Sequence, residues 1–264
     1  MVLLPFVDLD PDLGPQLATL RRLGGFFVLR TGAPPGAPPP TLAEAYALPP
    51  GDVSRRHPVV IRVGKVAAGI RAPEPRVAAS VAHQALAARL WSVALACAAL
   101  HGEVPDLDPR LLRWDPEASA PDDLWLAGVR PLPGDADTLA ALVVHRHLEP
   151  LAAVLRARYR VAPGLLRGNA ASALAGAARQ LDRWAGQSGH ARAGERARRL
   201  AGRLLDHPYL AGTGTLANTG TGTGTGTAFR RRSCCLYYRV PGGGVCGDCC
   251  FTRAPHSSPR ATSG

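Results

Sequence analysis

The stretch EPRVAASVAHQALAARLWSVALACAALHG, residues 74–102, decides the fold, because it predicts one long and largely apolar helix. Pro75 suits the first turn of a helix, since its missing N–H would have no intrahelical partner there. Glu74 suits the positive end of the helix dipole. Gly102 is the expected stop, because glycine readily takes the left-handed conformation that ends helices. We therefore expect a helix from about Glu74 to His101.

Further helices are expected on both sides of this one. One runs from about Pro15 to Leu23, and three follow at about 137–159, 164–186 and 190–206. Within them, GNAASALAGAA, residues 168–178, holds so many small side chains that a neighbouring helix can approach closely. Three short apolar runs read as strands: Phe26–Arg30, Val59–Val63 and Leu124–Arg130. The fold class expected is α+β and mainly helical, with a loop-rich C-terminal module built on four cysteines.

Four segments are expected along the chain. Residues 1–210 form the mainly helical domain, and residues 211–228, with their Thr-Gly repeat, read as a flexible linker. Residues 229–252 form the cysteine module, and residues 253–264 a disordered tail.

The location expected is cytoplasmic, with no membrane span. The N-terminus carries Asp8, Asp10 and Asp12 and lacks a basic region, which makes it a poor signal peptide. The most apolar stretch, Val77–Leu100, is interrupted by polar side chains, namely His83, Gln84 and Arg89.

The net charge of +11 indicates an anionic partner. Residues 156–203 contain eleven arginines and two acidic residues, and Arg230–Arg232 adjoin the cysteines. Most of these arginines are expected on a solvated face, with part of them attracting an anionic ligand or an acidic protein. Nucleic acid is not the expected partner, because Tyr237 and Tyr238 lie together in the cysteine loop instead of along a basic groove. Their expected role is to shield the cysteines from water.

The run RRRSCCLYYRVPGGGVCGDCC, residues 230–250, gathers five of the six cysteines. Cys234 and Cys235 are adjacent, and Cys246 and Cys249 follow as a C-x2-C pair. Four thiolates in one short segment indicate a metal or cluster site. Pro241 and the glycines 242–244 supply the turn between the pairs, and the glycine N–H groups are expected to donate hydrogen bonds to cluster sulfurs.

Three interpretations of the cysteines compete. A [2Fe–2S] cluster needs four terminal ligands, and adjacent cysteines suit a binuclear site because their side chains reach different atoms of one cluster. Structural zinc usually has two separated C-x2–4-C pairs, so the missing spacer between Cys234 and Cys235 counts against it. Disulfides or free thiols are disfavoured in a reducing cytosol. The spacing favours the [2Fe–2S] cluster, with zinc as the alternative.

The C-C-x10-C-x2-C spacing of SCCLYYRVPGGGVCGDC, residues 233–249, resembles the C-terminal signature of FhuF-like ferric siderophore reductases. RVAASVAHQALAARLWS, residues 76–92, and LLRGNAASAL, residues 165–174, are similar to the helical part of that family in its high-GC bacterial form. The resemblance implies that Cys234, Cys235, Cys246 and Cys249 bind a [2Fe–2S] cluster. It also implies a cytoplasmic enzyme that reduces iron held by siderophores.

Two features depart from the family pattern. Cys250 stands where an apolar residue is more usual, and it is either inert or a substitute for Cys249. The Thr-Gly repeat before the motif is expanded.

One-electron reduction of a ferric siderophore requires an external donor, because the chain lacks both a dinucleotide fingerprint and a P-loop. We expect a ferredoxin or a flavin reductase as that donor. The alternatives are an iron–sulfur electron carrier without siderophore specificity, a zinc-binding module and an iron–sulfur regulator.

Other residues have ordinary roles in this interpretation. Cys97 is expected to be a buried and inert thiol. His145 and His147 lie two apart on a helix and do not form a chelating pair. His83 and Asn169 are expected to pack, with a ligand contact as the alternative. The substrate pocket is expected between the cysteine loop and helical residues 83–91 and 165–172.

Overall fold

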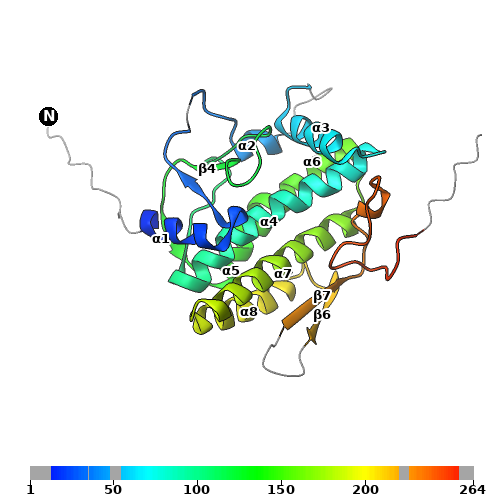
Figure 1. Cartoon of the computed structure of the whole chain (residues 1–264). Helices are drawn as coiled ribbons and strands as arrows, with labels where there is room; N and C mark the ends of the chain where they lie inside the picture. Colours follow the sequence, from blue (N-terminus) through cyan, green and yellow to red (C-terminus); the bar gives the residue numbers. More distant parts are fainter. Residues whose placement is uncertain (1–12, 35, 48–54, 220–225, 256–264) are drawn as a thin grey trace, which may run out of the picture.

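The structure is a computed structural model, and it describes residues 13–34, 36–47, 55–219 and 226–255. Its centre is helix α4 (Pro75–His101), which packs mainly against α7 (Pro163–Gln187), α3 (Pro58–Ile70) and α8 (Ala191–Leu205). Figure 1 shows α4 and α7 side by side through the middle of the molecule. The expected α+β class, mainly helical with a loop-rich cysteine module, is confirmed.

Helix α4 forms where the sequence predicts it. Pro75 stands in its first turn, and Gly102 ends it with a φ of 87° while its N–H bonds to the Ala98 carbonyl. Nearly every side chain from Val77 to Ala99 is buried, because three helices surround α4. The small side chains of α7 face α4 and α8 as expected, which brings the helices close.

The segment before α7 is one continuous helical rod with an irregular middle. Helix α5 (Ala136–Leu139) passes into a π-helical stretch, η3 (Ala140–Leu148), and then into α6 (Glu149–Tyr159). Pro150 lies at the start of α6 and lacks an N–H, and a proline ring crowds the carbonyl four residues earlier. The widened turns before it accommodate that ring.

The N-terminal part is less extended than expected. Helix α1 (Leu13–Thr19) continues into a 3₁₀ turn, η1 (Leu20–Leu23), and this agrees with the predicted helix. The predicted strand Phe26–Arg30 is wrong for most of its length. A second 3₁₀ turn, η2 (Gly25–Phe27), takes its first residues, and β1 comprises only Arg30–Thr31.

The predicted strand Val59–Val63 is also wrong, because these residues lie in α3. The His57 side chain accepts a hydrogen bond from the Val59 N–H, and Pro58 fills the first helical position. A short β-branched run is compatible with a strand and with a half-buried helix, so the flanking residues determine which of the two forms. Helix α2 (Leu42–Tyr46) precedes it, with a capping box between Thr41 and Glu44.

Short strands complete the helical body. The order β1-β4-β3 describes one sheet, in which β4 (Leu124–Leu126) pairs in parallel with β1 and antiparallel with β3 (Leu112–Trp114). Strands β2 (Glu103–Pro105) and β5 (Pro131–Pro133) form a separate pair. The predicted strand at 124–130 is therefore confirmed at its start only.

The flexible linker predicted at 211–228 is wrong where the structure describes it, because those residues belong to a hairpin of two strands. Strand β6 (Gly214–Thr219) pairs antiparallel with β7 (Gly226–Arg231). The Phe229 ring is buried, and a side chain at Gly214 would collide with that ring at 2.3 Å. The absence of a side chain at Gly214 thus leaves room for the Phe229 ring to pack within the hairpin. The predicted tail falls mostly on residues 256–264, which lie outside the described residues.

Two helical segments are long and apolar enough to cross a membrane, Pro75–His101 and Ala136–Tyr159. In the structure 78% and 56% of their apolar windows are buried against the rest of the protein. Both therefore serve as core helices of this fold.

Candidate metal centre

The five clustered cysteines lie together in the loops that follow β7, at one end of α4 and α7 (Figure 1). All six cysteines of the chain are free thiols. Cys97 is the sixth, and it is fully buried in α4, where burial raises its pKa to about 12. This agrees with an inert core thiol.

The sulfur atoms of the clustered cysteines lie close to one another. Cys235 Sγ lies 3.6 Å from Cys246 Sγ. A side-chain hydrogen bond with Cys235 lowers the pKa of Cys234, and the contact with Cys235 raises the pKa of Cys246. Cys250 and Cys249 are both close enough to Cys234 to act on it electrostatically. The four predicted ligands therefore form one group.

The described residues contain no set of three or more His, Cys, Asp or Glu side chains already closed around a metal ion. The side chains of Cys246, Cys235 and Cys234 follow one another in contact, with Cys250 and Cys249 near Cys234.

Backbone N–H groups are aimed at these sulfurs. The Leu236 N–H donates to Cys234 Sγ at 3.2 Å, and the Phe251 N–H donates to Cys249 Sγ at 3.4 Å. In both cases the donor lies two residues after the cysteine. Leu236 takes a left-handed φ of 69°, which costs a non-glycine residue about 1–3 kcal/mol. The chain thus turns sharply directly after the double cysteine.

The other two predicted ligands also have backbone two residues later beside them. The backbone of Tyr237 acts to lower the pKa of Cys235, and the backbone of Asp248 acts to lower the pKa of Cys246, although the pKa of both thiols is raised overall, first of all by the neighbouring thiols Cys234 and Cys235 respectively. Cys250 differs, because the backbone group that acts on its sulfur is its own. N–H donors lower the charge density on a thiolate and so stabilise a ligated sulfur. The surroundings of the four predicted ligands therefore differ from those of Cys250.

The glycine turn has another role than the one predicted. The Gly243 N–H donates to the Val240 carbonyl at 2.7 Å, so it is not free to reach a sulfur. A side chain at Gly243 would lie 2.5 Å from the Tyr237 carbonyl oxygen, and Gly242 takes a φ of 72°. These glycines allow the loop to fold tightly back, which brings the C-x2-C pair to the double cysteine.

Arg231 is a buried cation beside the thiols. Its side chain is 2% exposed, and it donates to Asn169 Oδ1 and, at 3.4 Å, to Gln84 Oε1. Its Nε has no hydrogen-bond partner. No carboxylate of the described residues forms an ion pair with it. A buried charge without a counter-ion is costly, so this site is built for an anionic group.

The anionic group that Arg231 faces is the set of thiols. Contacts with neighbouring thiols raise the pKa of Cys235 and Cys246, burial raises the pKa of Cys250, and the charge of Arg231 acts on all three as a smaller influence in the opposite direction. Four thiolates around two ferric ions and two sulfides carry net negative charge. The buried cation, the N–H groups that donate to Cys234 and Cys249, and the sulfur donor set therefore fit a [2Fe–2S] cluster held by Cys234, Cys235, Cys246 and Cys249.

The module is fastened to the helices by buried polar contacts. Ser80 Oγ on α4 donates to the Cys235 carbonyl at 2.7 Å, and Asn169 Nδ2 on α7 donates to the Ser80 carbonyl at 2.9 Å. Ser172 Oγ on α7 donates to Asp248 Oδ2 at 2.6 Å. The cysteine loops thus sit on the two central helices and not on a separate body.

Two further contacts complete this seat. Arg239 pairs with Glu74 at the start of α4, and Gly168 lets the chain pass close to α7. A side chain at Gly168 would lie 2.3 Å from Ser233 Oγ. The small residues of α7 therefore admit the cysteine module as well as a helix.

The remaining predicted residues have structural roles. Asn169 is a buried link between Ser80 and Arg231. His83 is fully buried, its ring nitrogens have no partner, and burial together with Arg231 lowers its pKa to about 3. His147 bonds to Tyr46 and Leu107 within the core, apart from His145.

The aromatic shield is only partly as expected. Tyr238 packs edge-on against Phe251, with ring centroids 5.9 Å apart. Tyr237 is 39% exposed and stands at the surface. Phe251, directly after the cysteines, takes a share of the covering that the sequence assigned to the two tyrosines.

Sequence reasoning missed three residues of the site, namely Arg231, Asp248 and Ser172. Arg230–Arg232 were expected to act together in attracting an anionic ligand or an acidic protein, but side chains alternate along β7, so Arg231 is buried while its neighbours are exposed. Recognition of β7 as a strand would have separated them. Asp248 lies inside the C-x2-C pair and was treated only as spacer.

Residues 231–251 match the family model described as the FhuF 2Fe-2S C-terminal domain. The match begins at the buried arginine and contains all four predicted ligands. No curated protein matches the chain.

Proposed function

Because residues 231–251 are a FhuF-type [2Fe–2S] domain, we propose that this protein reduces siderophore-bound ferric iron by one electron and releases ferrous iron in the cytoplasm. The observation that carries the proposal is the site itself. Four thiols lie together in one loop, Cys234 and Cys249 each receive an N–H from two residues later, and a buried arginine beside them lacks a carboxylate partner among the described residues.

Each group of the chain has a defined task in this reaction. Cys234, Cys235, Cys246 and Cys249 hold the cluster, which, when bound, supplies one electron at a time. The backbone N–H groups stabilise the sulfurs, and Arg231 compensates the added negative charge when an electron arrives. The contacts of Ser80 with the Cys235 carbonyl and of Ser172 with Asp248 keep this loop fixed on α4 and α7.

The electron balance requires one outside reductant. A ferredoxin or a flavin reductase gives one electron, and one siderophore-bound Fe(III) becomes Fe(II). No covalent bond to the protein forms and no proton is transferred by it. Ferrous iron is softer and carries less charge, so the hard oxygen ligands of the siderophore hold it more weakly. Release of the iron follows from that loss of affinity.

Two other functions use the same residues. An iron–sulfur electron carrier would need the cluster but no chelate. A zinc-binding module would use the same thiols, but zinc sites usually have two separated C-x2–4-C pairs, and Cys234 and Cys235 are adjacent. The positive charge of the chain, +11, supports a reaction with an anionic chelate more than either alternative.

The test is a single-turnover reaction under anaerobic conditions. Purified protein is reduced with one equivalent of electrons, freed from excess reductant and mixed with a ferric siderophore in the presence of a ferrous-specific chromophoric chelator. We expect the cluster absorption to return as about one ferrous ion appears per cluster. A cluster that stays reduced while the ferric chelate remains intact would refute the proposal, and one that reoxidises only with a ferredoxin would identify a carrier.

A further inference from the structure

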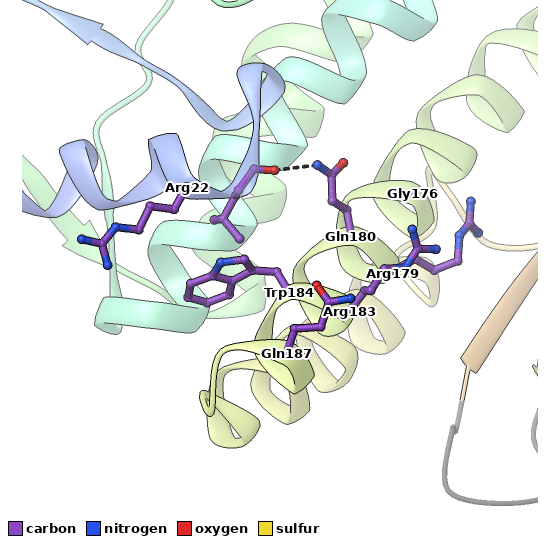
Figure 2. Close-up of a pocket in the computed structure, with 8 residues that line it drawn as sticks. Arg22, Gly176, Arg179, Gln180, Arg183, Trp184 and Gln187 are labelled. Atoms are coloured by element: carbon purple, nitrogen blue, oxygen red, sulfur yellow. Dashed lines mark hydrogen bonds between the residues drawn. The ribbon is translucent and has the colours of Figure 1, made fainter.

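A second feature of α7 lies further along the helix than the contacts of Asn169 and Ser172 with the cysteine module. A pocket of about 440 Å³ opens between η1 and α7, as Figure 2 shows. Small-molecule sites usually have volumes of roughly 300–1,000 Å³. Its principal side chains are Arg22, Arg179, Gln180, Arg183, Trp184 and Gln187.

The lining of the pocket carries three arginines and no carboxylate. Of the described residues, none forms an ion pair with Arg22 or Arg183, and both of these side chains are exposed. A guanidinium presents several N–H donors in a plane and binds anionic oxygen atoms strongly. The pocket is therefore suited to a compact anion that offers oxygen atoms in several directions.

The walls of the pocket are fixed before any ligand arrives. Gln180 Nε2 donates to the Leu23 carbonyl at 2.6 Å, which ties α7 to η1 (Figure 2). The Trp184 ring stacks on His190 with centroids 4.8 Å apart and planes at 9°. A preformed pocket with an aromatic wall suits a ligand that contains flat rings.

Arg179 joins this pocket to the metal centre. Its Nη2 lies 2.9 Å from Asp248 Oδ1, while its Nη1 is buried and has no hydrogen-bond partner. Asp248 lies within the C-x2-C pair, and its carbonyl accepts the Arg231 N–H at 3.0 Å. Arg183 follows one helical turn after Arg179, at about 6 Å along the axis. The pocket thus begins one contact away from the cysteine loop.

We infer that this pocket binds the ferric chelate and that it selects chelates with net negative charge over neutral ones. The inference rests on the proposed function, and it names the substrate class and the place where the substrate binds. This proposal places the substrate between η1 and α7, and not at residues 83–91 and 165–172 as expected from the sequence. Those helical residues face the cysteine module through buried contacts of Gln84 and Asn169 with Arg231.

The test uses redox-inert gallium chelates, because Ga(III) has the charge of Fe(III) and nearly its size but is not reduced. One probe is the triply negative gallium tris-catecholate, and its match is a neutral gallium tris-hydroxamate. Equilibrium dialysis of cluster-loaded protein, with gallium counted by elemental analysis, gives both affinities. We expect the tris-catecholate to bind at least about tenfold more tightly.

Charge-reversal variants locate the binding. Arg22→Glu with Arg183→Glu should weaken tris-catecholate binding by about tenfold or more and leave hydroxamate binding unchanged. Arg192→Glu with Arg203→Glu changes the net charge equally at exposed positions of α8, and it should have little effect. Unchanged circular dichroism and cluster absorption verify that each variant is folded.

Specific results would overturn the inference. Equal affinity for the two gallium chelates would do so, as would wild-type affinity in the Arg22→Glu/Arg183→Glu protein. Reduction of ferric tris-catecholate with an unchanged KM in that variant would refute the site and leave the proposed function standing. Selective gallium binding without any reduction of the ferric counterpart would refute the function and leave the site standing.

Discussion

The backbone N–H of Arg231 donates to the carbonyl of Asp248 at 3.0 Å, which joins the end of β7 to the C-x2-C loop. This bond brings the two cysteine pairs, ten residues apart in the sequence, onto one side of the loop. It also places the buried Arg231 guanidinium and the buried Asp248 carboxylate against α7. Asn169 of α7 contacts the guanidinium, and Ser172 contacts the carboxylate. The metal centre is therefore part of the helical core.

The N–H pattern predicts which cysteines bind the cluster. Serine at any one of Cys234, Cys235, Cys246 or Cys249 should remove most of the bound iron and labile sulfide, because Cys234 and Cys249 accept an N–H from two residues later, and the backbone two residues later also acts on Cys235 and Cys246. Cys250→Ser should retain both, since its sulfur lacks such a donor. Iron and sulfide per chain are measured after anaerobic purification.

Cys97→Ala is the matched control for loss of a thiol, because Cys97 is buried in α4 away from the loop. It should keep full cluster content. If Cys250→Ser loses the cluster while Cys249→Ser keeps it, the ligand assignment is wrong at that position.

Arg231 should set the reduction potential of the cluster. Its replacement by Gln removes a buried positive charge near Cys235 and Cys246, and the reduced cluster carries one more negative charge than the oxidised one. We expect the potential of Arg231→Gln to fall by about 60 mV or more, equivalent to a tenfold change for one electron. A spectroelectrochemical titration measures it.

Arg232→Gln is the control for this shift. Arg232 lies next to Arg231 but is exposed, so water screens its charge. Its potential should stay near that of the unmodified protein. Equal shifts in both variants would indicate a general effect of net charge and contradict a role for the buried guanidinium.

The contact between α7 and the cysteine module predicts opposite effects for two glycines of one helix. Gly168→Ala places a methyl group 2.3 Å from Ser233 Oγ, and the hydrogen bond from Ser233 to the Gly164 carbonyl must move. Overpacking of this kind costs roughly 1–3 kcal/mol of unfolding free energy. Gly176→Ala meets its nearest atom at 3.9 Å and should stabilise α7 by roughly 0.5–1 kcal/mol.

Urea unfolding followed by circular dichroism measures both variants. Ser233→Gly in the Gly168→Ala background removes the colliding hydroxyl and should recover part of the loss. Equal effects of the two alanines would mean that the module does not press on α7 at Gly168.

The sequence predicts those parts of this molecule whose cause is local. Helix α4 is predicted because Pro75, an apolar run and Gly102 lie within one stretch, and the four ligands are predicted because their spacing is itself the signal. The strand expected at Val59–Val63 fails because His57 and Pro58, and the packing against α4, turn the same run into a helix.

Remote partners explain what the sequence does not reveal at the site. The burial of Arg231 depends on Gln84 and Asn169, which lie 147 and 62 residues away along the chain. The pocket arginines likewise come from η1 and from α7, which only the packed helices bring together. The sequence alone does not distinguish these arginines, because it does not show which of them is buried.

Burial of His147 predicts a pH dependence of stability. Its pKa is lowered to about 4, mainly by burial, from an ordinary value near 6.5. The unfolded chain therefore binds a proton that the folded protein refuses between those two values, and folding loses stability as the pH falls through that range. The loss attributable to this group is on the order of 3 kcal/mol by pH 4.

His147→Gln isolates this term, because glutamine stays neutral and its amide is able to donate to the Leu107 carbonyl that His147 Nε2 contacts at 2.6 Å. Urea unfolding of both proteins at pH 7 and pH 4.5 gives the comparison. The variant is expected to lose clearly less stability between the two pH values than the unmodified chain, although it starts lower at pH 7 because the contact with Tyr46 is altered. Other buried groups, His83 among them, titrate equally in both proteins and cancel in the difference. An identical pH dependence would mean that His147 is protonated in the folded state, and the buried, neutral imidazole described here would then be wrong.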